Sequence, residues 1–124
     1  MAARRFSKAS IEALAHAKMI GVRAGTAHKY TGVWVVVVEG RVFVRSWNDK
    51  RTGWFRAFLD EPAGSIQFAD VERKVRATPT RSQRLRDAVS GAYGEKYDTS
   101  ASQKWVRGFA QTKRAVNTLE LTPR

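Results

Sequence analysis

The sequence contains no cysteine and only two histidines, His16 and His28, among its 124 residues. Without cysteine the chain cannot form a disulfide, carry a thiolate nucleophile or bind zinc through sulfur, which fits a reducing compartment. The sequence also contains no H-E-x-x-H pair, no carboxylate cluster at metal-ligand spacing and no G-x-S-x-G nucleophile elbow. We therefore expect no metal site, and no catalytic residue can be assigned from a motif.

Long hydrophobic runs are also missing. The longest run, Val33 to Val38, is far shorter than the roughly 20 apolar residues that a membrane helix needs. The basic start of the chain, Met1 to Arg5, is not followed by the apolar segment of a signal peptide. We therefore expect a cytoplasmic protein without a membrane-spanning segment.

Acidic residues are scarce, with 11 Asp and Glu against 23 Lys and Arg, which gives a net charge of +12 and a pI near 10.9. A field of this sign attracts anions such as phosphorylated small molecules or nucleic acid. The window from Arg73 to Arg86 holds six cations and no acid. This window is either a solvated strand and helix start or a stripe that binds nucleic acid without sequence specificity.

The residues that are present indicate one mostly β domain spanning residues 1–124. About 43% of them are hydrophobic, and no linker or internal repeat divides the chain. The segment Val33–Val38 is β-branched at nearly every position and predicts a buried strand, which Glu39-Gly40 turns into a partner at 41–47. Further strands are predicted at 20–24, 65–69, 71–78 and 118–122. Short antiparallel strands hide their edges by closing on themselves, so the pattern predicts a mainly β (α+β) fold, a six-stranded antiparallel barrel with flanking helices.

Helices are expected between and around these strands. Capping signals predict helices that start after Ser7, Thr80 and Ser100. A further short helix begins near Trp54 and is stopped by Pro62.

One strand face gathers aromatic and cationic side chains. By the alternation of a strand, Arg41, Phe43, Arg45 and Trp47 share one face. More donors and another aromatic ring follow directly in the chain: Ser46, Asn48, Lys50 and Trp54. Such a set suits an anionic ligand that carries a flat ring and a phosphate. The alternative is that the aromatic residues belong to the core while the cations extend outward, and for Phe43 this alternative is favoured.

The segment from Val33 to Pro62 resembles a small bacterial family of unknown function, through Trp34, the run VFVRSWNDK and the run GWFR. This resemblance extends over nearly the whole chain, to the ending Leu119-Glu-Leu121. More distantly, the pattern of two strands, a polar loop, a Trp-aromatic helix ended by proline and two more strands is similar to the deazaflavin-dependent nitroreductases. These share the split β-barrel fold of the pyridoxamine-phosphate oxidases.

The resemblance implies a split β-barrel that binds FMN or a deazaflavin, acts in redox chemistry and forms a homodimer. Carried over by position, it implicates eight cofactor-binding residues: Arg45, Ser46, Asn48, Lys50, Trp54, Lys29, Tyr30 and Thr31. A glycine-rich loop typical of the nitroreductases is replaced here by a bulkier, charged segment at 47–52. Two alternatives stay open: a non-catalytic module that binds an anionic small molecule, and a non-specific nucleic-acid-binding domain.

The aromatic content supports the homodimer prediction. Four Trp, three Tyr and six Phe are more aromatic surface than a core of this size readily hides. Because Trp47, Trp54 and Trp105 fall in or beside loops and helix starts, a partner chain could cover them. We therefore expect the ligand site at or near a dimer interface.

Overall fold

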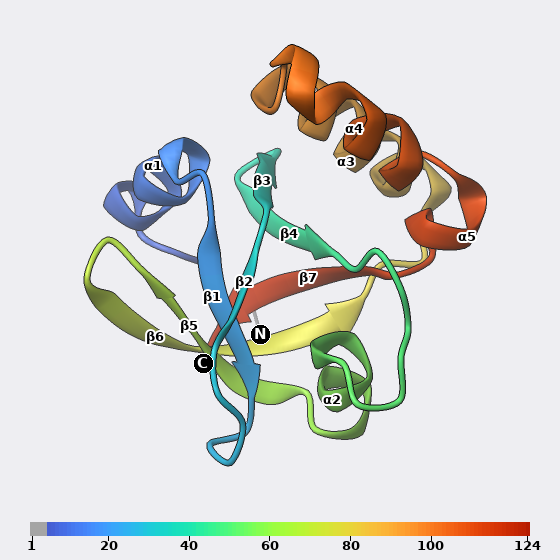
Figure 1. Ribbon diagram of the computed structural model, residues 1–124. Coiled ribbons are helices and arrows are strands. Elements are labelled where there is room, and N and C mark those ends of the chain that lie inside the picture. The colour runs from blue at the N-terminus through green and yellow to red at the C-terminus, as the bar shows by residue number, and fades with distance from the viewer. Residues whose placement is uncertain (1–4) are drawn as a thin grey trace.

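The computed structural model describes residues 5–124 (Figure 1). Its strands form one antiparallel sheet in the order β2-β1-β5-β6-β7-β4-β3. The two edge strands are consecutive in the chain and are separated only by Trp34, so the backbone itself joins the two edges of a nearly closed barrel. The predicted fold class is confirmed. The strands are β1 (Ile20–Ala24), β2 (Thr31–Val33), β3 (Val35–Val38), β4 (Arg41–Arg45), β5 (Ala63–Phe68), β6 (Val71–Pro79) and β7 (Thr118–Pro123).

Seven strands appear instead of six because the predicted strand at 33–38 begins earlier and is interrupted at Trp34. Before the interruption β2 pairs with β1, and after it β3 pairs with β4. Two side chains hydrogen-bond to the backbone at this point: the Tyr93 hydroxyl donates to the Trp34 carbonyl (3.3 Å), and the Val35 N–H donates to the Tyr97 hydroxyl (3.2 Å). The interruption therefore changes the strand with which this segment pairs, and these backbone groups keep a hydrogen-bond partner.

The helices close the barrel and cover one of its sides. Helices α1 (Lys8–His16) and α2 (Trp54–Asp60) lie at opposite ends of the barrel, while α3 (Gln83–Lys96) and α4 (Gln103–Phe109) lie together beside β3 and β4 (Figure 1). A 3₁₀ turn (Ser100–Ser102) precedes α4, and the short α5 (Thr112–Ala115) leads into β7. No helix among residues 5–124 combines the length and apolar character needed to cross a membrane.

Of the three predicted helix caps, one is confirmed. The Ser7 hydroxyl accepts from the Ser10 N–H at 3.1 Å. The prediction for Thr80 is wrong, because its N–H donates to the Thr118 carbonyl (2.9 Å) and extends the sheet, while Ser82 caps α3. The prediction for Ser100 is also wrong, because Ser100 is itself the first residue of the 3₁₀ turn and Thr99 caps it.

The core has two parts on either side of the barrel wall. The first fills the barrel, is centred on residues such as Val42, Val44 and Ile66, and includes Leu14 of α1 and Phe58 of α2 at its ends. The second lies between the outer face of β3–β4 and the helices α3 and α4, and contains Val36, Phe43, Leu85, Val89, Tyr93, Tyr97 and Phe109. The strand face predicted to carry aromatic and cationic side chains is therefore the face that α3 and α4 cover, and Phe43 is core.

Candidate functional site

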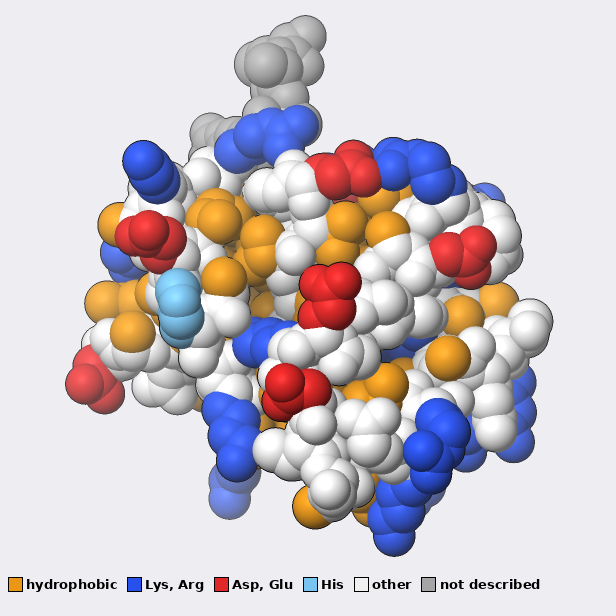
Figure 2. Space-filling model, turned by 90° about the horizontal axis from the view of Figure 1, so that it is seen from above, with side chains coloured by type: hydrophobic (Ala, Val, Ile, Leu, Met, Phe, Trp, Pro, Cys, Tyr) orange, Lys and Arg blue, Asp and Glu red, His pale blue; other side chains and the backbone are white. Residues whose placement is uncertain are grey.

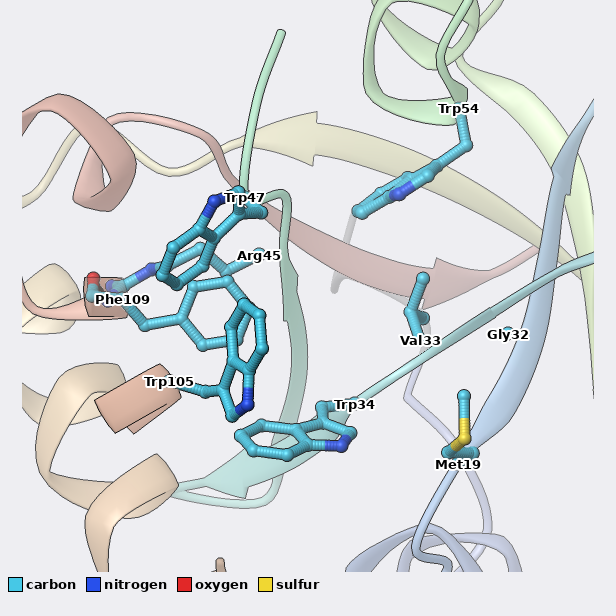
Figure 3. Close-up of a pocket in the computed structure, with 9 residues that line it drawn as sticks. All are labelled: Met19, Gly32, Val33, Trp34, Arg45, Trp47, Trp54, Trp105 and Phe109. Carbon is cyan, nitrogen blue, oxygen red and sulfur yellow. Dashed lines mark hydrogen bonds between the residues drawn. The ribbon is translucent and has the colours of Figure 1, made fainter. Parts of the chain in front are cut away.

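All four tryptophans of the chain line one pocket of about 560 Å³ (Figure 3). It opens where β2 ends and the chain crosses to β3, so that the barrel wall, α2 and α4 all contribute to it. The complete lining is Met19, Gly32, Val33, Trp34, Arg45, Trp47, Trp54, Trp105 and Phe109. A volume of several hundred Å³ with mostly aromatic and apolar walls is typical of small-molecule sites.

The tryptophans reach the pocket from four separate elements, and their neighbours hold the rings. Trp34, between β2 and β3, stacks on Tyr97 with ring centroids 4.0 Å apart and an interplanar angle of 4°. Trp47, which follows β4, meets Trp105 of α4 edge to face at 5.0 Å. Trp54 is the first residue of α2 and stands across the pocket from these rings (Figure 3). The arrangement offers aromatic surface on both sides of a space.

The Trp47 ring is fixed by an arginine and a glycine. The Arg114 guanidinium carbon lies 3.6 Å from the Trp47 ring centroid, and its Nε donates to the Trp47 carbonyl at 3.0 Å. A Cβ at Gly108 would lie 2.1 Å from the Trp47 ring, so α4 can approach this closely only with glycine there. The position of this wall therefore depends on the packing of α4.

Arg45, a predicted phosphate ligand, lies at the base of the pocket with only 2% of its surface exposed. Its guanidinium donates to Thr118 Oγ1, Ser90 Oγ and the carbonyls of Phe109 and Arg86, at 2.7 to 2.9 Å. Burial lowers the pKa of Arg45. In Figure 3 the side chain runs behind the rings of Trp47 and Phe109. These contacts favour a positioning role that fastens α3 and α4 to the barrel, and a direct role toward phosphate stays a prediction.

A smaller polar pocket of about 110 Å³ adjoins the first, and Trp54 lines both. Three of the predicted residues, Lys29, Thr31 and Trp54, line this second pocket. The structure adds the polar residues Arg23, His28 and Thr52 to them. Cationic and hydroxyl groups beside an aromatic pocket can hold an anionic tail.

Three other predicted residues form the loop between β4 and α2 and bond mainly to one another. Ser46 is buried and its hydroxyl donates to the Asn48 carbonyl. The Asn48 side-chain oxygen accepts from the Lys50 N–H at 3.1 Å, and the Lys50 carbonyl accepts from Gly53 at 2.9 Å. The Lys50 side chain is exposed. Bonds within the loop and bonds from Asn117 and Arg114 thus hold it in place, and the ligand-binding role of these residues stays a prediction.

Tyr30, the eighth predicted residue, is not brought together with Lys29 and Thr31. Its hydroxyl donates to Glu72, and the Arg23 guanidinium lies over its ring at 4.5 Å. Burial and the bond to Glu72 raise its pKa. Tyr30 therefore lines neither pocket, although Arg23, which contacts its ring, lines the second.

The support behind Trp34 comes from the end of α3. The Tyr97 hydroxyl donates to the Lys18 carbonyl at 2.7 Å, next to Met19 of the pocket lining. Lys96 Nζ donates to the carbonyls of Leu14 (3.1 Å) and Val35 (2.7 Å). Burial lowers the pKa of Lys96 to about 8 and raises that of Tyr97. This pair fastens α1 and the entry to β1 against the pocket wall.

Two cations of the basic window from Arg73 to Arg86 make polar contacts with other parts of the chain. Arg84 pairs with Glu39, and Arg86 Nε donates to the Thr80 carbonyl at 2.8 Å. Figure 2 shows Lys and Arg side chains spaced around the edge of one face, with acidic side chains between them. Nucleic-acid binding stays an untested prediction.

Sequence analysis missed most of the pocket. Trp34, Phe109 and Met19 were not predicted as site residues. Trp47 was predicted as part of the aromatic and cationic ligand-binding set and, like Trp54 and Trp105, was also expected to be covered by a partner chain. The signal available was the number of tryptophans in or beside loops. Within residues 5–124 no group of three or more His, Cys, Asp or Glu could hold a metal ion.

Comparisons with known proteins place the chain in a family and give its fold neighbours. Residues 10–121 match a family described as uncharacterized proteins conserved in bacteria (DUF2255). No curated protein matches the sequence significantly. A conserved hypothetical protein, Rv2991 from Mycobacterium tuberculosis, is similar in structure, with a TM-score of 0.58 at 15% identity over 98% of this chain and 81% of that one. An FAD-binding protein (mll6688) from Mesorhizobium loti has a TM-score of 0.52 at 12% identity over 98% and 91%. At such identities the likeness shows the fold.

Proposed function

The chain belongs to the DUF2255 family of uncharacterized bacterial proteins, and we propose that it binds a flavin or deazaflavin whose ring lies in the four-tryptophan pocket. The observation that carries the proposal is that four separate segments of the chain, between residues 34 and 105, each bring a tryptophan to the same space. Planar rings gain both from burial and from stacking on such walls. The pocket volume of about 560 Å³ also lies within the range of cofactor sites.

The second pocket supports a ligand with a polar, anionic tail. It shares Trp54 with the first pocket, so a molecule with a ring and a phosphate can occupy both. We assign the tail to Lys29 and Thr31. Lys50, in the exposed loop that leads into α2, would add a further positive charge. The net charge of +12 favours an anionic ligand over a neutral one.

One of the two fold neighbours supports the same class of ligand. The Mesorhizobium protein is described as FAD-binding, and this chain covers 91% of its length. Because identity is 12%, the support is for a fold that accommodates a flavin, and the residues that hold it here must be argued from this chain.

A bound flavin or deazaflavin would supply hydride transfer, so the protein need only bind, orient and shield. The pocket lining fits this division, since Arg45 is its one ionisable side chain and lies behind the rings. The tryptophans exclude water from the ring, and Lys29 holds the tail. The same lining also suits a module that binds without turnover, which is the second candidate function.

Equilibrium dialysis against FMN, followed by the visible absorption spectrum of the protein, tests the proposal. We expect saturable binding with one site per chain and about tenfold or greater loss in Trp54→Leu, since an aromatic contact of this kind contributes on the order of 1–3 kcal/mol. Trp105→Leu is a second wall variant on an exposed residue. Absence of bound FMN and of a bound deazaflavin at micromolar protein would overturn the proposal.

We further propose that the binding unit is a homodimer. Met19 (55% exposed) and Trp105 (45% exposed) are apolar side chains at the pocket, and a partner chain that covered them would also close it. Light scattering at micromolar protein, with and without FMN, measures the mass. A monomer under both conditions contradicts the homodimer.

A further inference from the structure

The pocket contains a stretch of strand edge in addition to its aromatic rings. Strand β2 is an end strand of the sheet, and its only strand partner is β1. Two of its three residues, Gly32 and Val33, line the pocket. Polar backbone groups therefore occur in a lining whose side chains are almost all apolar.

The direction of these backbone groups follows from antiparallel pairing. Along such a strand, successive residues turn their N–H and C=O alternately toward the partner strand and away from it. The register pairs Gly32 with Gly21 and Val33 with Ile20. Hence one of these two neighbours turns both its N–H and its C=O away from β1, toward the free edge of β2.

These outward groups have no partner in the described protein. Beyond the pairing with β1, no side chain or loop backbone of residues 5–124 makes a hydrogen bond to Thr31, Gly32 or Val33. A Cβ at Gly32 would meet Met19 Cε at 2.8 Å, so the Met19 side chain packs directly over Gly32 beside this edge. A ligand that covered these groups and left them unpaired would bind at a cost, whereas a ligand that pairs with both gains specificity.

We infer that the free edge of β2 recognises the hydrogen-bonding edge of a planar heterocycle, one in which an N–H lies beside a carbonyl. The inference rests on the proposed function and deepens it, because the imide end of an isoalloxazine or deazaflavin ring has this pattern. The ring then extends β2 in the way that an added strand would, with its faces between the tryptophans. The benzene end of the ring points away from β2 and makes apolar contacts alone.

Three ring analogues test the inference on the unmodified protein. Lumiflavin has a free imide N–H, 3-methyl-lumiflavin has it blocked, and a lumiflavin with one extra methyl group on the benzene ring is the matched control for size. Binding is measured by quenching of tryptophan fluorescence. We expect 3-methyl-lumiflavin to bind about tenfold more weakly or worse, because it leaves backbone groups unpaired, and the benzene-ring analogue to bind within about threefold of lumiflavin.

The outcomes separate this inference from the proposed function. Equal binding of all three rings, or equal weakening by both methyl groups, overturns recognition by β2 while flavin binding stands. Failure of lumiflavin, FMN and a deazaflavin to bind overturns the proposed function, and the inference falls with it. Selective weakening by the imide methyl group alone supports both.

Discussion

The contact between α4 and Trp47 can be tested by one added methyl group. In Gly108→Ala the new Cβ would lie 2.1 Å from Trp47 Cη2 and 2.5 Å from Cζ3, well inside any real contact distance. The Trp47 ring cannot move away freely, because Arg114 stacks on it at 3.6 Å and Trp105 meets it at 5.0 Å. Either α4 moves outward or the ring changes position, and in both cases the pocket wall shifts.

The expected magnitude follows from two opposing terms. Overpacking of a core contact costs about 1–3 kcal/mol, and a clash with two ring carbons held from behind belongs at the upper end. Replacing glycine by alanine in a helix stabilises the folded state by up to about 1 kcal/mol. We therefore expect Gly108→Ala to lower the free energy of unfolding by about 2 kcal/mol.

Gly91→Ala is the matched control, because it lies in α3 and a Cβ there meets nothing within 4 Å. We expect this variant to gain about 1 kcal/mol, so the two alanine variants should differ by about 3 kcal/mol. Urea unfolding followed by circular dichroism measures both, and flavin titration should show weaker binding for Gly108→Ala alone. If both variants gain stability equally, Trp47 and α4 are not packed as described.

Three further results are expected. Tyr97→Phe keeps the stack on Trp34 but loses the hydroxyl that bonds to Lys18 and Val35, so urea unfolding should show a loss of about 1–3 kcal/mol; no loss would mean those bonds are absent. Burial lowers the folded-state pKa of Lys96 from 10.5 to about 8, so between these pH values the unfolded chain binds more protons than the folded one. The free energy of unfolding, measured relative to Lys96→Met, should therefore rise from pH 8 to pH 10.5, and a flat or falling difference contradicts the burial of Lys96. Lys29→Ala should weaken FMN binding about tenfold and leave lumiflavin unchanged, since only FMN has the phosphate; equal loss for both would remove Lys29 from the tail site.

Local signals predicted most of the fold. The β-branched run from Val33, the turn at Glu39-Gly40 and the stop at Pro62 all lie where the structure has strands, a turn and a helix end. The interruption at Trp34 was not predictable, because it depends on hydroxyls of Tyr93 and Tyr97 about 60 residues away. The helix caps were mispredicted for the same reason, because Thr80 pairs with the distant Thr118 and so extends the sheet.

The site was predicted in part, for a related reason. Alternation placed Arg45 on the same face as Trp47, and the structure has it there. Alternation does not say which layer covers that face, so the hydrogen bonds from Arg45 to α3, α4 and β7 could not be predicted from it. That Trp34, Trp54 and Trp105 line one pocket likewise depends on how distant elements close around the barrel.

We claim that a flat, flavin-like ring lies between the four tryptophans, and a titration with FMN followed by intrinsic fluorescence distinguishes this from every alternative site. Since every tryptophan of the chain lines the pocket, ligand binding there should quench most of the emission in one saturable phase, and Trp54→Leu should weaken the transition. A titration in which FMN and a deazaflavin leave the tryptophan emission unchanged, apart from inner-filter absorption, would contradict the claim.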